Sequence, residues 1–288
     1  MELQQLKNIA AQVRRDIVRM VHGCQSGHPG GSLGCADLLV ALYFHEMKID
    51  DTKNTEGFID FKRAGEKEDI FFLSNGHISP VFYSVLSRRG YFPVSELATF
   101  RKINSRLQGH PATHEGLPGI RVASGSLGQG LSVAAGAGLA KRLHKDDRFV
   151  FVLMGDGEQQ EGQIWEAVQF VPNHQLDHLI AIVDWNGQQI DGTTMQVNDN
   201  RDLKAKYQAF GWDTIDLEDG NDMEQVLEAL KKAKARCGEG RPVVILMKTG
   251  MGYGVDYMMG THKWHGAAPN DEQLQTALNQ LPETLGDY

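Results

Sequence analysis

The sequence predicts an α/β fold in which helices cover both faces of a parallel sheet. Five short segments are typical of strands, four of them apolar almost throughout, and segments with helical spacing separate most of them along the chain. Strands that are buried on both faces of a sheet show this pattern. The predicted strands are 69–74, 148–155, 178–185, 211–217 and 242–249. A length of 288 residues suits one large domain, so we expect a single domain spanning residues 1–288.

Six segments carry apolar residues at helical spacing or are otherwise typical of helices. The predicted helices are 3–22, 32–46, 126–143, 161–171, 199–210 and 222–237. Ser32 is the expected N-cap of the second helix, because serine accepts hydrogen bonds from backbone N–H groups at a helix start. The helix at 126–143 is rich in glycine, which costs helix propensity unless close packing requires it. We therefore expect another element to lie against this helix.

Composition excludes several classes of partner. The formal charge is -8 and there is no run of Lys or Arg, which argues against a nucleic-acid or anionic-membrane surface. Cys24, Cys35 and Cys237 show no C-x-x-C spacing, so neither a disulfide framework nor a zinc ribbon is indicated. We expect a reducing, cytoplasmic location, with no signal peptide and no membrane span.

Polar residues follow two neighbouring predicted strands. Gly155, Asp156 and Gly157 end one strand, and Asn186 with Gly187 ends the next. A Gly-Asp-Gly alone is more often an ordinary turn, but parallel sheets bind ligands beyond the carboxyl ends of their strands, where both loops open into one crevice. A carboxylate and an amide there suit a hard cation such as Mg²⁺, which completes its shell with water and phosphate oxygens. The pattern therefore indicates a bound diphosphate.

These residues resemble a known family. The stretch "GDGEQQEGQIWEA" followed by "DWNGQQIDG" resembles the thiamine diphosphate motif, which would make the fold a thiamine diphosphate-binding domain of the diphosphate type. Further stretches narrow the resemblance to transketolases: "SGHPGGSLG" at 26–34, "LSNGH" at 73–77, "GHP" at 109–111, "GSLGQG" at 125–130 and "WHG" at 264–266. The resemblance spans nearly the whole chain. It covers only the N-terminal part of the single-chain enzyme, without the pyrimidine-binding and C-terminal domains.

The resemblance implies a cofactor site. Asp156 and Asn186 would bind Mg²⁺ through side-chain oxygens and Gln188 through its backbone carbonyl, with Ca²⁺ or Mn²⁺ as substitutes. Gly155 and Gly157 would contact the diphosphate.

The remaining implied roles concern the rest of thiamine diphosphate and the substrate. His77 and His265 match histidines near the phosphates and the thiazolium, and Glu161 matches a glutamate that links paired active sites. His28 and His110 match histidines that meet substrate hydroxyls. The backbone of Gly125 and Leu127 would face the aminopyrimidine.

The implied activity is transfer of a two-carbon ketol unit from a ketose to an aldose, as in pentose phosphate metabolism. Protons move on hydroxyl and carbonyl oxygens in such a transfer, which suits imidazoles that titrate near neutrality. Because the family's pyrimidine-binding glutamate and phosphate-binding arginines belong to the missing domains, we expect half of a split transketolase. A separate polypeptide would supply those domains in an α₂β₂ assembly acting on sugars, with sugar phosphates expected by analogy with the family.

Two other interpretations remain open. One is the α subunit of a 2-oxo acid dehydrogenase-like thiamine enzyme, and the other is a non-catalytic module of the same fold.

Six further histidines are expected at the surface or in the core: His22, His45, His114, His144, His174 and His178. His262 and His265 form an H-x-x-H that lacks neighbouring ligands for zinc. Glu158 is expected to be exposed at a helix start, and segment 50–70 is more charged than the family's usual connection.

Overall fold

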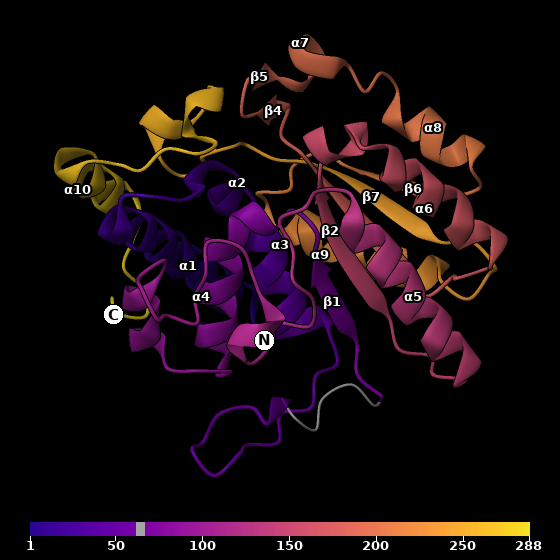
Figure 1. Cartoon of the computed structure of the whole chain (residues 1–288), viewed down its shortest axis with the longest axis horizontal. Coiled ribbons are helices and arrows are strands. Elements are labelled where there is room, and N and C mark those ends of the chain that lie inside the picture. The colour runs from indigo at the N-terminus through magenta and orange to yellow at the C-terminus, as the bar shows by residue number, and fades with distance from the viewer. Residues whose placement is uncertain (62–66) are drawn as a thin grey trace.

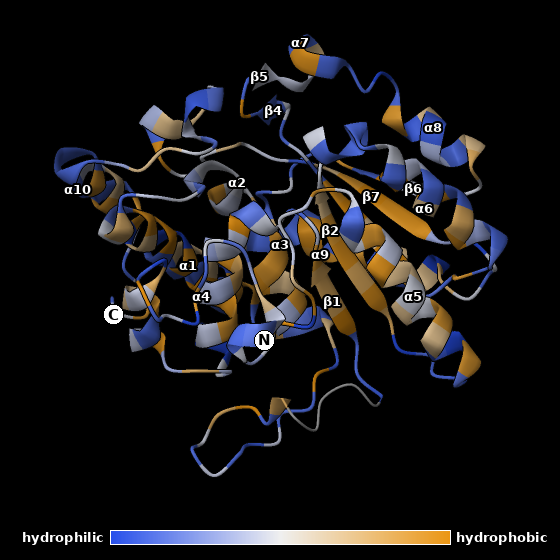
Figure 2. Cartoon of the chain, in the orientation of Figure 1, coloured by the Kyte–Doolittle hydropathy of each residue, from blue (hydrophilic) through white to orange (hydrophobic). Residues whose placement is uncertain are grey.

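The computed structural model describes residues 1–61 and 67–288, so part of the charged segment 50–70 lies outside the described residues. Its centre is a parallel five-stranded sheet in the order β1-β2-β3-β7-β6 (Figure 1). The strands are β1 Ile70–Leu73, β2 Val150–Gly155, β3 Leu179–Trp185, β6 Asp213–Leu217 and β7 Val243–Lys248. All five strands predicted from the sequence are confirmed. The largely hydrophobic residues of β1, β2 and β7 stand out in Figure 2.

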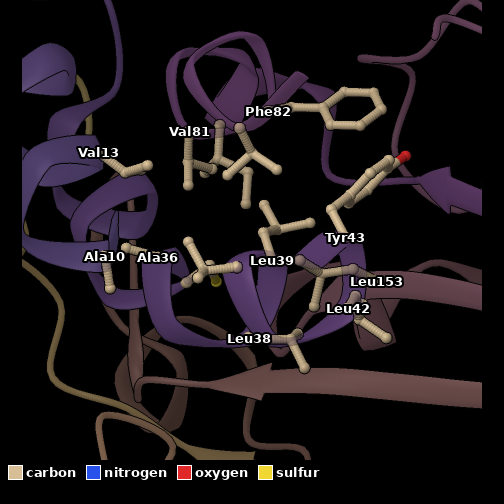
Figure 3. Close-up of a cluster of buried hydrophobic side chains, with 14 of the residues drawn as sticks. Ala10, Val13, Ala36, Leu38, Leu39, Leu42, Tyr43, Val81, Phe82 and Leu153 are labelled. Atoms are coloured by element: carbon tan, nitrogen blue, oxygen red, sulfur yellow. The ribbon is translucent and has the colours of Figure 1, made fainter. Parts of the chain in front are cut away.

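Helices cover both faces of this sheet, as expected (Figure 1). On one face pack α1 Leu3–Cys24, α2 Pro29–Gly34, α3 Ala36–Ala41, α4 Ser79–Arg89 and α9 Met223–Arg236. On the other face pack α5 Gln129–Leu143, α6 Gly162–Asn173 and α8 Leu203–Ala209. Successive strand residues alternate between the two cores: Phe151 and Leu153 join the first, and Val152 joins the second. Figure 3 shows Leu153 meeting side chains from the helices of the first core.

Shorter elements complete the chain. A short antiparallel hairpin follows β3. Its two strands, β4 Gln188–Gln189 and β5 Gly192–Thr193, have two residues each, and α7 Thr194–Asn198 follows them. α10 Asp271–Gln280 packs on α1 near the C-terminus. Short 3₁₀ helices lie at Gly76–Ile78, Val94–Thr99, Thr113–Glu115, Gly157–Gln160, Asp256–Met258 and His262–Trp264. No helix in the described ranges combines the length and the hydrophobicity needed to cross a bilayer.

The predicted helix 32–46 is wrong in its details. It is divided into α2, α3 and a π-helical turn at Leu42–Glu46, and it begins earlier, because Pro29 supplies a preformed first turn. Ser32 is therefore no N-cap. It lies inside α2, fully buried, and its hydroxyl donates to the His28 carbonyl at 2.7 Å. The helices α4, α7 and α10 were not predicted from the sequence.

The glycine-rich helix α5 does have a close neighbour, and the contact is at Gly130. A Cβ on Gly130 would lie 2.3 Å from the Cβ of Ser74, at the end of β1. Gly136, further along the helix, has nothing within 4 Å of such an atom and is exposed. Close packing therefore explains Gly130, whereas Gly136 carries only the cost in helix propensity.

This contrast gives a matched pair of substitutions. We expect Gly136→Ala to raise the free energy of unfolding by about 0.5–1 kcal/mol, because alanine removes the propensity cost. Gly130→Ala should lower it by about 1–3 kcal/mol, because the methyl group overpacks against Ser74. Urea denaturation of the chain followed by circular dichroism measures both. Equal effects of the two substitutions would contradict the packing explanation.

Candidate active site

The loops that follow β2 and β3 are joined by the carboxylate of Asp156. Its two oxygens accept hydrogen bonds from the backbone N–H of Gly157 at 2.8 Å and of Gly187 at 2.6 Å. The parallel register pairs Gly155 with Asp184, so both loops leave the sheet at the same edge. Burial and the nearby Asp184 raise the pKa of Asp156 to about 7. The two polar loops thus converge, as the sequence predicts.

Asn186 is held in one orientation by Asp184, a residue that sequence reasoning missed. The side-chain amide of Asn186 donates to Asp184 Oδ2 at 2.8 Å, and its oxygen accepts from the Gln188 N–H at 2.9 Å. Asp184 also accepts from the Thr249 hydroxyl and is 1% exposed. Desolvation raises its pKa. Because the amide nitrogen of Asn186 donates to Asp184, its amide oxygen faces Gln188.

A cavity of about 230 Å³ opens where these loops meet. The metal-binding residues expected from the sequence, Asp156, Asn186 and Gln188, all line it. Its walls also include further predicted site residues: His77, Leu127, Gly155, Gly157, Glu161 and His265. The cavity therefore collects most of the cofactor site that the resemblance implies.

Gly125 does not line this cavity. Its backbone lies against the ring of His110, where a Cβ would come within 2.7 Å of the imidazole. Its φ of 125° also suits glycine, because side chains disfavour that backbone conformation. Gly125 thus lies on the side of the histidines rather than on the side of the strand-end loops.

The structure brings the four predicted histidines together from four separate segments. The ring centroid of His28 lies 5.2 Å from that of His77, 5.5 Å from that of His265 and 6.1 Å from that of His110. The His77 and His265 centroids are 4.9 Å apart. Since His77 and His265 also line the cavity, the cluster adjoins it.

These four imidazoles favour the neutral form. Burial, followed by the charge of His265, lowers the pKa of His28 to about 4. Burial also lowers the pKa of His77, His110 and His265. The Nδ1 atom of His28 is buried without a hydrogen-bond partner. The cluster therefore offers neutral ring nitrogens, one of them unpaired, to a polar ligand.

The expectation that Glu158 is a solvent-exposed residue at a helix start is wrong. Glu158 is 2% exposed, and its carboxylate accepts hydrogen bonds from the Ser74 hydroxyl, the Gly128 N–H at 2.7 Å and the Gly155 N–H at 3.0 Å. It therefore ties together the ends of β1 and β2 and the loop that begins α5. Its side chain also reaches the cavity wall.

The donor set fits a magnesium ion and its phosphate ligands. The side-chain oxygens of Asp156 and Asn186 and the carbonyl of Gln188 are hard oxygen donors on one cavity. Within residues 1–61 and 67–288, no group of three or more His, Cys, Asp or Glu residues could hold a metal ion by itself. A metal bound here would therefore need the amide and carbonyl oxygens. The absence of a side chain at Gly157 lets the Gln189 side chain lie close to its backbone, since a Cβ there would lie 2.9 Å from the Gln189 amide oxygen.

Five of the other histidines have contacts outside this cluster. His22 contacts Asp271, His45 contacts Glu46, His114 contacts Glu115 and His178 contacts Asp177. The ring of His174 packs on Phe170 at 4.0 Å between centroids.

Comparisons with known proteins agree with this geometry. Residues 5–283 match the family model described as "Transketolase, thiamine diphosphate binding domain". The fold and this match define a thiamine diphosphate-binding α/β domain. The chain belongs to the transketolase family, whose members are transferases.

Two relatives match over nearly their full length. The chain is 36% identical to an apulose-4-phosphate transketolase subunit from Phocaeicola vulgatus, with 99% of this chain and 95% of that protein covered. It is 35% identical to a 6-deoxy-6-sulfo-D-fructose transketolase subunit from Clostridium sp., with 96% of each covered.

Solved transketolases match over a smaller share of their length. The transketolase of Pichia stipitis in complex with sedoheptulose 7-phosphate superimposes with a TM-score of 0.86 at 31% identity. The match covers 97% of this chain and 41% of that one. The chain thus spans about two fifths of the solved transketolases that it matches.

The buried carboxylate of Glu158 gives a stability test. We expect Glu158→Gln to lower the free energy of unfolding by about 1–3 kcal/mol, because the new amide group would face a backbone N–H and leave donors unsatisfied. Glu166→Gln is the matched control, since Glu166 is exposed on the neighbouring helix α6. Urea denaturation measures both variants. A loss for Glu158→Gln no larger than that for Glu166→Gln would show that the three hydrogen bonds do not stabilise the fold.

Proposed function

We propose that this chain is the thiamine diphosphate-binding subunit of a split transketolase, which transfers a two-carbon ketol unit from a ketose to an aldose with thiamine diphosphate and Mg²⁺. The observation that carries the proposal is the cavity that Asp156 and Asn186 share with two members of the histidine cluster. The family and the full-length relatives named as transketolase subunits support it.

In this proposal the strand-end loops hold the metal and the diphosphate. Asp156, Asn186 and the Gln188 carbonyl bind Mg²⁺, for which Ca²⁺ or Mn²⁺ can substitute, and the backbone at Gly155 and Gly157 approaches the phosphates. When bound, thiamine diphosphate supplies the nucleophilic carbon that the chain itself lacks. The chain contributes placement of that cofactor and exclusion of water from the cavity.

In this proposal the histidines bind the substrate and accept or donate its protons. His28 and His110 hydrogen-bond to substrate hydroxyls, and the unpaired Nδ1 of His28 can accept one of those protons. The rings of His77 and His265 contact that of His28 and also line the cavity, so in this proposal they would adjoin the phosphates and the thiazolium. Neutral imidazoles suit this work, because each can accept a proton at one nitrogen and donate from the other.

The remaining site residues face the partner. In this proposal the backbone of Gly125 and Leu127 contacts the aminopyrimidine, and Glu161, exposed at the start of α6, links the paired active sites. The partner subunit supplies the pyrimidine-binding and C-terminal domains in an α₂β₂ assembly. The substrates are sugars of the sugar phosphate class, and neither nucleic acid nor membrane is a partner. Three free cysteines are consistent with a cytoplasmic location.

Reconstitution tests this function. The purified chain is mixed with a polypeptide that carries the missing domains, and two-carbon transfer between sugar phosphates is measured with thiamine diphosphate and Mg²⁺. We expect transfer only in the mixture, in a complex whose mass by light scattering corresponds to two copies of each polypeptide. Full turnover by the chain alone would contradict the split, and a stable one-to-one complex would contradict the α₂β₂ assembly.

The role of Asp184 can be tested through metal affinity. We expect Asp184→Asn to weaken Mg²⁺ binding to the reconstituted complex about 10- to 100-fold, as for other residues that orient metal ligands. The substitution would place an amide group among donors from Thr249 and Asn186, so the Asn186 side chain would lose its fixed orientation. Calorimetric titration with Mg²⁺ at saturating thiamine diphosphate measures this. Asp271→Asn, an exposed substitution on α10, is the control, and equal affinities in both variants would refute the role.

A further inference from the structure

Arg101 lies beside the histidine cluster and joins two of its loops. Its Nη1 donates to the Ser26 hydroxyl at 3.2 Å, two residues before His28. Its Nη2 lies 3.5 Å from the carbonyl of Gly109, the residue before His110. One side chain therefore contacts both segments that carry the predicted substrate-binding histidines.

The local structure holds this guanidinium in place. Arg101 has a φ of 56°, in the left-handed region that arginine rarely adopts. A Cβ on Gly109 would lie 2.4 Å from its Cζ atom, so the absence of a side chain at Gly109 lets the guanidinium lie close to the backbone. The ring of Phe100 lies 5.6 Å from the same Cζ atom. Backbone strain retained next to a site is typical of a functional constraint.

The charge of Arg101 has no acidic partner. Among residues 1–61 and 67–288, no Asp or Glu forms an ion pair with it, and its Nε is buried without a hydrogen bond. Arg106, five residues later, differs in this respect, because it forms two hydrogen bonds with Glu96. An uncompensated charge in a partly buried position acts strongly on its neighbours.

Its neighbours are the histidines. After burial and His265, the positive charge of Arg101 is the next cause that lowers the pKa of His28, followed by His110. For His110, burial and Arg101 together lower the pKa. The charged or titratable groups around His28 are thus His77, His110, His265 and Arg101, with no carboxylate acting on it among the described residues.

We propose that Arg101 is a positioning residue that fixes the two loops of His28 and His110 relative to each other and, through its unpaired charge, adds to the effect of burial in keeping both imidazoles neutral. This inference rests on the proposed function for its catalytic consequence. Neutral rings can accept a proton from a sugar hydroxyl, whereas imidazolium rings cannot. Arg101 acts on the substrate only through the two histidines.

The first measurement is the ionisation of His110, which requires no turnover. His110 is the exposed member of the cluster and is only partly desolvated. Its carbethoxylation by diethyl pyrocarbonate across a pH series, followed by peptide mass spectrometry of the reconstituted complex, therefore gives its pKa. We expect Arg101→Met to raise this pKa by on the order of one unit, because a positive charge is removed. Arg101→Lys, which keeps the charge, and Arg106→Met, which removes a paired charge, should each change it far less.

The second measurement is the pH profile of kcat/KM for two-carbon transfer, which reports groups of the free enzyme. A raised histidine pKa moves the acid limb toward higher pH, so Arg101→Met should lose activity below neutrality more than above it. Arg101→Lys, which keeps the positive charge, should retain the wild-type profile. An unchanged His110 pKa in Arg101→Met would overturn the inference even if activity fell, since only a structural role would remain.

Direct binding of a substrate's anionic end is the competing role. Arg101→Met would then raise KM for a phosphorylated donor much more than for an unphosphorylated one, with an unaltered pH profile. That result would overturn the proposal. If the complex transfers no ketol unit at all, the proposed function fails, while the His110 measurement still decides the role of Arg101.

Discussion

The hydrogen bond between the Asp156 carboxylate and the Gly187 N–H is the interaction on which the site depends. It joins the loops after β2 and β3 above the sheet register that pairs the two strands. Asp184 and Glu158, both buried acids, extend the same arrangement to Asn186 and to the start of α5. Three carboxylates that are costly to bury therefore fix three loops around one cavity, and their hydrogen bonds to backbone and amide donors offset that cost.

Much of the fold follows from the sequence, because every strand except β6 is largely apolar and carries a strong signal. The helix α4 was missed, since nine of its eleven residues are buried and it shows little amphipathic periodicity. The site divides in a similar way. Asp156 and Asn186 were predictable because each ends a strand, whereas the burial of Asp184 and Glu158 leaves no pattern in the sequence. The four histidines come from distant segments, so only a family resemblance could group them.

The proposed division of the enzyme into separate polypeptides fits the distribution of groups in this structure. The oxygens proposed to bind the metal and the imidazoles belong to one chain and are already positioned in it. Charged groups that would recognise the far end of a sugar are not needed for that arrangement. The relatives' names include a sugar phosphate in one case and a sulfonated sugar in another. A shared catalytic half combined with differing partners would allow such variation without changing the chemistry.

The close packing of the four imidazoles limits how much charge they can carry. Neighbouring rings lie 4.9–6.1 Å apart, and the pKa values of His28 and His77 are each lowered by other histidines of the cluster. Once one ring is protonated, repulsion disfavours a second protonation. Each proton that the cluster takes up therefore makes the next one less favourable. Proton exchange through this cluster would consequently favour single protons over pairs.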